Sequence, residues 1–481
     1  MKKILFAASE CVPFIKTGGL ADVVGSLPKY FDRSNYDVRV VLPKYTSIDK
    51  KYKEKMVYLD SFEMGINGQN QYVGVLTCKY DEVTFYFIDS EYYFSGESIY
   101  GGVSDWNIEK FAFFSKAVLS ILPVINFRPD LIHCHDWQTG LIPVYLDNFR
   151  YLGKYYQGIK TIMTIHNLKF QGVWEATAVQ RITELPQYYF VSDKLEAYQA
   201  ANLLKGGIVF ADKVTTVSES YAQEIKTPFY GEGLDGLMNA RSADLVGIVN
   251  GLDYQVFNPQ LDYRIAKNFT VEDFRQKKPK NKQALQEEVG LPKNPKVMLM
   301  GIVSRLTGQK GFDLVECVME EICKEEIQLV VLGTGEERYE NLFKYFAWKY
   351  PEKVSANIYY NETLSHQIYA GCDGFLMPSL FEPCGLSQLM SLRYGTIPIV
   401  RETGGLKDTV LPYNEYEKTG TGFGFVNYNA HEMLDTIRYA ISVYYNRKRQ
   451  WNKMIERGME QDFSWNNSTK QYEKLYDELI G

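Results

Sequence analysis

Residues 3–31 read KILFAASECVPFIKTGGLADVVGSLPKYF, and this stretch sets the pattern for the whole chain. The apolar run Lys3–Ala8 is followed by the pair Gly18-Gly19 and then by an amphipathic segment, Leu20–Phe31. This succession predicts a buried strand, a glycine loop and a helix, which is the repeating unit of a parallel α/β sheet. Backbone N–H groups in such a loop, with the charge of Lys16, can hold a phosphate, although a plain strand-to-helix turn also needs small residues.

The remainder of the chain repeats this alternation in two series. In the first series we expect a mostly buried helix at Asn107–Val124 and strands at Val38–Leu42, Leu131–His135, Thr161–Ile165 and Lys213–Ser218. The second series begins at Lys296 and continues the alternation through Val297–Val303, Phe312–Cys323, Gln328–Leu332, Glu336–Lys349, Asn357–Tyr360, Ser365–Ala370, Gly374–Met377 and Ile397–Val400.

A polar segment with several prolines, Tyr254–Pro295, separates the two series, and we interpret it as a connection that includes a helix at Lys282–Val289. Apolar residues recur at helical spacing in Trp465–Leu479. The sequence therefore predicts an α/β protein with two Rossmann-like, doubly wound domains that face each other across a deep cleft. The expected divisions are residues 1–253, residues 254–464 and a C-terminal helix within residues 465–481. Ligands of such sheets bind at the carboxyl ends of the strands.

Composition narrows the class of protein. The 481 residues are 45% hydrophobic and 23% charged, and 53 basic against 59 acidic residues give a net charge of −6. This balance disfavours a nucleic-acid partner, because phosphates need an excess of positive charge. We find no apolar run long enough to span a membrane. The seven cysteines form no Cys-x-x-Cys pair, which favours reduced thiols in the cytoplasm over a disulfide framework.

Two strand ends of the first series carry polar side chains. The first is His133-Cys134-His135-Asp136-Trp137, where a zinc site is the less favoured interpretation because alternate residues point to opposite faces of a strand. A polar strand tip that presents His135, Asp136 and Trp137 to a ligand is favoured, with His133 as a core histidine. The second is Thr164-Ile165-His166-Asn167. His166 could bind hydroxyl groups of a ligand, act as a base or cap the strand.

Two strand ends of the second series suit an anionic sugar ligand. The loop Ser304–Gly311 carries Arg305 and Lys310 ahead of a helix, an arrangement suited to a diphosphate, although a solvated basic turn would look the same. The string Pro378–Ser387 places Glu382 in an apolar setting just before a helix. Glu382 could bind sugar hydroxyl groups or balance positive charge, and the N–H groups of the helix could hold a phosphate. A cap of the helix is the simpler alternative.

Taken together, these strings resemble the glycogen/starch synthase family of glycosyltransferases. The resemblance covers nearly the whole chain. Each string alone is weak evidence for the family, but their common order along the chain is highly specific. The strings are Lys16–Asp22, His135–Trp137, Thr164–Asn167, Asn250-Gly251, Ser304-Arg305, Phe381–Leu386 and Thr403–Gly405.

The resemblance implies the GT-B arrangement and transfer of glucose from ADP-glucose to the non-reducing end of an α-1,4-glucan, with retention of the anomeric configuration. It implies that the first domain lies on the acceptor side, that the second binds the donor, and that the C-terminal helix crosses back to the first domain. It implies no metal or other cofactor. Whether the chain forms homo-oligomers is left open.

The resemblance also suggests roles for individual residues. As catalytic residues it suggests Glu382, His166, Asp136, Arg305 and Lys310. For the donor it suggests Lys16, Gly18, Gly19, Asn250, Arg305, Lys310, Tyr360, Cys384, Gly385, Leu386 and Ser387, with Tyr360 stacked on adenine. For the acceptor the candidates are Asp136, Trp137, Tyr92 and Tyr93. Met390 stands where many retaining GT-B enzymes have a second glutamate, so the contact to the ribose is unassigned.

Two other kinds of protein remain alternatives. A phosphorylase or another GT-B transferase, such as one that uses UDP-glucose, would share the fold, but a phosphorylase needs a lysine that binds pyridoxal phosphate and the sequence singles none out. A non-catalytic glucan-binding scaffold would not need Arg305, Lys310 and Glu382 together, because it has no diphosphate to bind.

Overall fold

The computed structural model describes residues 1–96 and 98–481, and the chain divides into two compact units. Unit 1 comprises Met1–Val217, Ala222–Gly251 and Trp465–Gly481, and unit 2 comprises Ser218–Tyr221 and Leu252–Ser464. The sequence placed the boundaries after residues 253 and 464, so the first differs by two residues. It did not foresee that Ser218–Tyr221 would belong to unit 2. The cleft between domains stays a prediction.

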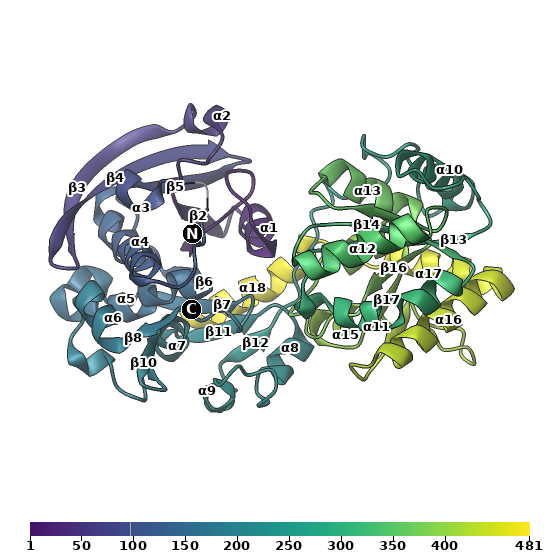
Figure 1. Ribbon diagram of the computed structural model, residues 1–481. Coiled ribbons are helices and arrows are strands. Elements are labelled where there is room, and N and C mark those ends of the chain that lie inside the picture. Colours follow the sequence, from purple (N-terminus) through teal and green to yellow (C-terminus); the bar gives the residue numbers. More distant parts are fainter. Residues whose placement is uncertain (97) are drawn as a thin grey trace. The chain divides into compact units, whose positions relative to one another are not determined.

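Unit 1 is built on a nine-stranded sheet in the order β12-β11-β7-β6-β1-β2-β5-β4-β3 (Figure 1). The strands are β1 (Lys2–Ala7), β2 (Tyr36–Pro43), β3 (Val57–Ile66), β4 (Gln69–Tyr80), β5 (Val83–Asp89), β6 (Leu131–His135), β7 (Lys160–Ile165), β11 (Lys213–Thr216) and β12 (Leu245–Gly247). A small sheet, β8-β10-β9, adds β8 (Val173–Glu175), β9 (Glu196–Ala197) and β10 (Ala200–Asn202).

The sheet of unit 1 is not wholly parallel, which corrects the expectation from the sequence. β4 runs antiparallel to both β3 and β5, whereas the other pairs are parallel. The sequence analysis assigned no strand to this meander of Val57–Asp89. β3 exposes most of its first residues and lacks the continuous apolar run of a central parallel strand, whereas β5 is mostly buried.

Helices cover the faces of the large sheet in unit 1. They are α1 (Gly19–Ser26), α2 (Lys50–Lys53), α3 (Glu91–Phe94), α4 (Asp105–Val124), α5 (Leu141–Leu152), α6 (Ala176–Thr183), α7 (Leu203–Phe210), α9 (Asp235–Ala240) and the C-terminal α18 (Trp465–Ile480). A further helix, α8 (Glu219–Glu224), begins in unit 2 and ends in unit 1. The helix predicted for Leu20–Phe31 ends at Ser26 and continues as a 3₁₀ turn at Leu27–Lys29. Pro28 explains the change, because it cannot donate the hydrogen bond that would continue the α-helix.

Unit 2 contains a fully parallel, six-stranded sheet in the order β15-β14-β13-β16-β17-β18. The strands are β13 (Met298–Val303), β14 (Ile327–Leu332), β15 (Val354–Asn357), β16 (Gly374–Met377), β17 (Ile397–Arg401) and β18 (Phe423–Phe425). The helices are α10 (Phe274–Glu288), α11 (Phe312–Lys324), α12 (Glu337–Lys349), α13 (Glu362–Gly371), α14 (Ser387–Arg393), α15 (Gly404–Thr409), α16 (Ala430–Asn446) and α17 (Lys448–Glu460). The strand order reverses between β13 and β16, and such a switch point is where doubly wound sheets bind ligands.

Two predicted elements of unit 2 are displaced. The strand expected at Asn357–Tyr360 ends where that range begins, at Asn357. The helix expected at Lys282–Val289 starts eight residues earlier, at Phe274, and contains Pro279. Buried side chains explain the extension, because the ammonium group of Lys278 donates to the carbonyl oxygen of Ala370 at 2.8 Å and so fastens the first turns of α10 to the unit.

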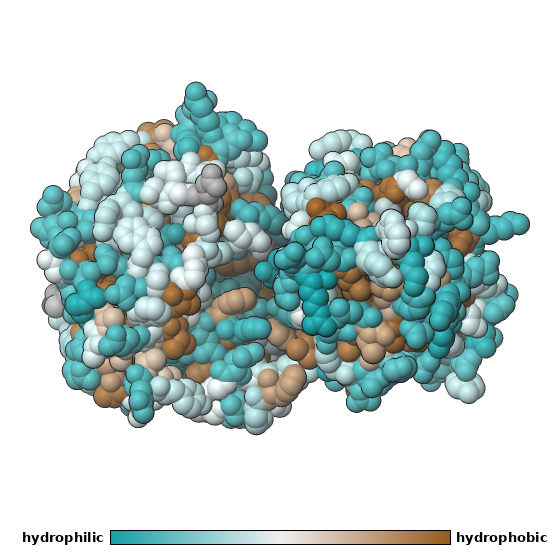
Figure 2. All heavy atoms as spheres, in the orientation of Figure 1, coloured by the Kyte–Doolittle hydropathy of each residue, from teal (hydrophilic) through white to brown (hydrophobic). Residues whose placement is uncertain are grey.

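Hydrophilic residues cover much of the visible surface of each unit, with small hydrophobic areas between them (Figure 2). Among the described residues, no helix combines the length and the hydropathy that a membrane crossing requires.

Candidate active site

In unit 2 the loops that follow β13 and β16 pack on each other at the switch point. The amide of Leu380 donates to the carbonyl oxygen of Gln309 at 2.9 Å. Gly311 has a φ of +77°, and a Cβ there would lie 2.0 Å from the carbonyl oxygen of Pro378. Only glycine fits this close approach. The basic loop and the Glu382 loop, 72 residues apart in the chain, therefore form one structure.

An ion pair joins the two loops. The Nζ atom of Lys310 lies 2.7 Å from Oε2 of Glu382, and the hydroxyl of Ser379 donates to the same oxygen at 3.0 Å. Glu382 is 6% exposed. A carboxylate taken this far out of water is stable when a cation and a hydrogen-bond donor accompany it. The sequence predicted both residues as functional, and the structure brings them into contact.

A second glycine pair supports the backbone of Glu382. The amide of Gly405 donates to the carbonyl oxygen of Glu382 at 3.0 Å. At Gly404, where φ is +46°, a Cβ would lie 2.0 Å from that oxygen. The start of α15 can therefore lie directly against the Glu382 loop. This close contact is the physical reason for the Thr403–Gly405 string.

The other donor-side candidates of unit 2 surround this loop. Cys384 is buried, Gly385 has a φ of +71°, Leu386 is the N-cap of α14, and the hydroxyl of Ser387 accepts a hydrogen bond from Tyr369 at 3.2 Å. Met390 packs against the apolar core of unit 2, so the contact to a ribose remains unassigned.

Arg305 and Tyr360 differ from these residues because both are exposed. Arg305 lies in the loop after β13 and makes no ion pair with any described residue. Tyr360 follows β15 and is 80% exposed. Each side chain is thus accessible to a ligand, and the roles predicted for them stay predictions.

In unit 1 the neighbouring strands β6 and β7 bring Asp136 and His166 together. The amide of His166 donates to Oδ1 of Asp136 at 2.7 Å. Asp136 has a φ of +58°, a conformation that costs energy for a residue with a side chain and that occurs often at functional sites. Burial raises the pKa of Asp136 to about 7, while amide donors oppose the shift and the carboxylate of Glu10 adds to it.

Two further histidines, His133 and His135, lie next to this pair, and His135 is buried instead of presenting its ring to a ligand as expected. His133 is buried, and its ring nitrogens contact Tyr476 at 2.6 Å and Thr164 at 2.5 Å, which confirms it as a core histidine. The Nδ1 atom of His135 lies 3.0 Å from Nε2 of His166. Burial lowers the pKa of His166 to about 3, so this imidazole is neutral near pH 7.

The glycine loop after β1 is bound by a carboxylate that sequence reasoning missed. Oε2 of Glu10 accepts hydrogen bonds from the amide of Thr17 at 2.5 Å, from its hydroxyl at 2.7 Å and from the amide of Gly18 at 3.3 Å. Two N–H groups expected to bind phosphate are thus turned toward Glu10. The position of Glu10 shortly after the first strand was the feature of the sequence that could have identified it as part of the site. Lys16 pairs with Asp22 at 2.8 Å, and Gly19 is the first residue of α1.

The acceptor candidates of unit 1 fall into exposed and buried residues. Tyr92 is 56% exposed, whereas Tyr93 is 1% exposed and its hydroxyl donates to Glu109 at 2.7 Å. Assigning Tyr93 to the acceptor was therefore wrong for this structure, because packing in the core closes its ring to a ligand. Trp137 is 8% exposed, since Phe111 packs on it and Gly172 lies close to its ring, so little of the ring is left for a sugar.

Asn250 has the properties of a ligand-binding residue in the same unit. It is 6% exposed, and its buried Oδ1 atom has no hydrogen-bond partner among the described residues. Buried polar atoms are nearly always paired, so an unpaired one is a candidate contact for a substrate. Among the described residues, no group of three or more His, Cys, Asp or Glu side chains is arranged to hold a metal ion.

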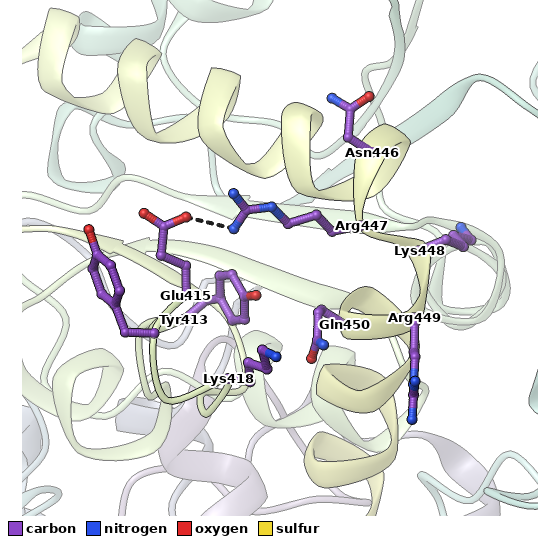
Figure 3. A pocket seen from close by; sticks show the side chains of 9 residues that line it. Tyr413, Glu415, Lys418, Asn446, Arg447, Lys448, Arg449 and Gln450 are labelled. Atoms are coloured by element: carbon purple, nitrogen blue, oxygen red, sulfur yellow. Dashed lines mark hydrogen bonds and ion pairs between the residues drawn. The ribbon is translucent and has the colours of Figure 1, made fainter.

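A separate cavity of about 590 Å³ in unit 2 lies between the loop before β18 and the junction of α16 and α17 (Figure 3). Glu415 and Arg447 form an ion pair at 2.6 Å across it. The other lining residues are Tyr413, Tyr416, Lys418, Asn446, Lys448, Arg449 and Gln450. The cavity is thus outside the predicted site.

Comparison with known proteins identifies the class. Residues 3–240 match the family described as starch synthase catalytic domain, and residues 281–458 match glycosyl transferases group 1. The catalytic domain of starch synthase IV from Arabidopsis thaliana, solved with ADP and acarbose, superposes with a TM-score of 0.91 at 31% identity, over 100% of this chain and 99% of that one. The fold and the site thus define a two-domain α/β glycosyltransferase of the GT-B type.

Curated relatives identify the family within this class. Glycogen synthase of Lachnospira eligens is 65% identical over 479 residues, and glycogen synthase of Lachnoclostridium phytofermentans is 63% identical over 479 residues. In both cases the match covers 100% of each chain. The chain belongs to the glycogen synthase family.

Proposed function

We propose that this enzyme transfers glucose from ADP-glucose to the non-reducing end of an α-1,4-glucan and retains the anomeric configuration. The observation that carries the proposal is the buried pair of Lys310 and Glu382 at the strand switch point of unit 2. The printed names of the relatives and the ADP and acarbose of the starch synthase IV structure support the choice of donor and acceptor.

The cationic residues bind the leaving diphosphate in this proposal. Arg305 and Lys310 neutralise its charge, together with Lys16 and the N–H groups of Gly385, Leu386 and Ser387. Charged hydrogen bonds in a site that excludes water stabilise a transition state strongly, because the donors are already oriented. Gly18 and Gly19 let the chain approach the phosphates, and Tyr360 stacks on the adenine.

The proposed reaction does not require a covalent bond between the glucose and the enzyme. The bond between C1 of glucose and the diphosphate oxygen breaks, and the acceptor hydroxyl forms the new bond to C1 on the same face. Its proton passes to the departing diphosphate. Glu382 orients the glucose and stabilises the positive charge that grows on the ring, an effect larger in the transition state than in the ground state. Two carboxylates about 5 Å apart, as in retaining glycosidases, are not needed.

The residues of unit 1 complete the site in this proposal. Asp136, His166 and Asn250 bind the reacting glucose, while Tyr92, with Asp136 and Trp137, contacts the glucan. No metal takes part, because Arg305, Lys310 and Lys16 supply the positive charge that a divalent cation would otherwise provide. Full activity after exhaustive dialysis against EDTA would support this part of the proposal, and loss of activity that Mg²⁺ or Mn²⁺ restores would overturn it.

The test is a transfer assay with glycogen as acceptor and labelled ADP-glucose, UDP-glucose or glucose 1-phosphate as donor. We expect rapid incorporation from ADP-glucose and release of the label by an α-1,4-specific amylase. Faster incorporation from UDP-glucose would reassign the donor. Incorporation from glucose 1-phosphate alone would indicate a phosphorylase, and glycogen binding without turnover would indicate a scaffold. The cytoplasmic location and a homo-oligomeric state remain predictions, testable by cell fractionation and by light scattering.

A further inference from the structure

We infer that His135 fixes His166 as the tautomer with its proton on Nδ1, so that His166 acts as a hydrogen-bond donor and not as a base. His135 is a positioning residue in this inference. The sequence left open whether His166 binds hydroxyl groups or takes up a proton. The contacts of the two rings decide between these possibilities.

The two imidazoles share one hydrogen bond, between Nδ1 of His135 and Nε2 of His166 at 3.0 Å. One of these nitrogens must carry the proton and the other must accept it, because a neutral imidazole has one donor and one acceptor. If His135 donates, its own Nε2 is unprotonated and the proton of His166 is on Nδ1. If His166 donates, the proton of His135 is on Nε2.

The surroundings of Nε2 of His135 distinguish the two cases. This atom is buried and has no hydrogen-bond partner among the described residues. The ring is 0% exposed, with Phe6 stacked on it at 5.4 Å and His133 at 4.3 Å. A buried N–H without an acceptor is rarer in proteins than a buried acceptor without a donor. The proton is therefore on Nδ1 of His135, and that nitrogen donates to His166.

The neighbouring histidine cannot supply the missing partner. Both ring nitrogens of His133 are engaged, one with the hydroxyl of Tyr476 in α18 and the other with that of Thr164. The backbone of His135 is also held, because its amide donates to the hydroxyl of Thr139 at 2.7 Å and its carbonyl oxygen accepts from the same hydroxyl at 2.9 Å. The ring of His135 thus has a fixed place between its neighbours.

The consequence concerns the outer edge of His166, which is only half-buried. With Nε2 accepting from His135, the neutral ring presents an N–H group at Nδ1. Such a group binds a hydroxyl or ring oxygen of a sugar but cannot remove a proton. This assignment of the ligand rests on the proposed function, whereas the tautomer itself does not.

The tautomer can be measured directly by long-range ¹H–¹⁵N NMR on protein labelled at histidine, since the chain contains only five histidines. We expect a pyridine-type Nε2 and a pyrrole-type Nδ1 for His166 in the full-length protein. His135→Phe keeps a buried ring but removes the donor, and we expect a mixture of His166 tautomers. His135→Asn places an amide N–H near the position of Nδ1 and should restore the wild-type signal. His431→Phe, at an exposed histidine of unit 2, is the control.

A proton on Nε2 of His166 in the wild-type protein would overturn the inference, whatever the enzyme is found to catalyse. So would an unchanged His166 spectrum in folded His135→Phe. In the transfer assay we expect His135→Phe to lower kcat about tenfold or more with a smaller change in KM, and His135→Asn to recover most of the loss. If the NMR result holds and kcat does not change, the tautomer assignment stands and the proposed role of His166 fails.

Discussion

The pKa of a buried carboxyl group is raised in unit 1 and lowered in unit 2, as Asp136 and Asp262 show. In unit 1, Asp136 receives hydrogen bonds from neutral amides and lies near a second carboxylate, Glu10, so burial raises its pKa to about 7. In unit 2, burial would also raise the pKa of Asp262, but hydrogen bonds from His366 at 2.6 Å and Tyr394 at 2.7 Å outweigh it and lower the pKa to about 2.

The difference teaches that burial alone does not decide the charge of a carboxyl group. The number and kind of donors decide it, and a cation or a strong donor can keep a buried carboxylate ionised. In unit 2, Lys310 and Ser379 both bind one oxygen of Glu382.

The largest effect is expected at Glu382. Glu382→Gln keeps the size of the side chain but removes the charge, so we expect kcat to fall by roughly 10²–10³-fold, with a smaller change in the KM for ADP-glucose. The melting temperature should change little compared with Glu320→Gln, a matched control on α11 whose carboxylate pairs with Lys349 at 2.8 Å. An unstable variant with normal turnover per folded molecule would instead assign Glu382 to capping α14.

A smaller loss is expected at Arg305, an exposed cation of unit 2. Arg305→Ala should lower kcat/KM by about 10²-fold, because the diphosphate loses a charged donor. The free energy of unfolding should not change, since no described residue pairs with this side chain. Arg338→Ala, which breaks an exposed pair with Glu316, is the control. Equal rates for Arg305→Ala and Arg338→Ala would remove Arg305 from the site.

Asp262→Asn tests how much the ionised carboxylate of Asp262 contributes to the stability of the folded protein. We expect the free energy of unfolding to fall by about 2 kcal/mol at pH 7, because the pKa of Asp262 is lowered from an ordinary 3.8 to about 2. A lowered pKa stabilises the folded state above pH 4, so the difference from wild type should disappear as the pH falls from 4 to 2. Urea titrations at several pH values measure it, with Asp435→Asn, at an exposed position, as control.

Asp136→Asn should change stability with the opposite sign. The pKa of Asp136 is raised to about 7, so the ionised form destabilises the folded state, and this effect grows as the pH rises from 4 to 7. We expect the variant to gain up to about 4 kcal/mol over wild type at pH 8, because the pKa is raised from an ordinary 3.8 to about 7, and nothing below pH 4. Asp193→Asn, at an exposed position of unit 1, should show no such dependence. A variant less stable than wild type at pH 8 would contradict the raised pKa.

Much of the fold was predictable because local sequence and physics agree along most of the chain. The central parallel strands are buried on both faces, so continuous apolar runs mark them in the sequence. Once these strands were located, the polar residues at their ends could be identified directly. The meander of Val57–Asp89 and the early start of α10 could not be predicted in this way. The first begins with β3, whose exposed residues form no continuous apolar run, and the second depends on Lys278 reaching carbonyl groups about 90 residues away.

The sequence by itself determined the parallel α/β alternation, the division into two units and most of the residues at the strand ends. Those features depend on the spacing of apolar residues, on the polarity of the residues at the strand ends and on the glycines that let loops approach each other. Only the tertiary structure decided that Lys310 pairs with Glu382, that Glu10 binds the glycine loop, that Tyr93 is buried and that His135 contacts His166. The physical reason is that charge, tautomer and accessibility depend on neighbours in space, which strand order places together from distant parts of the chain.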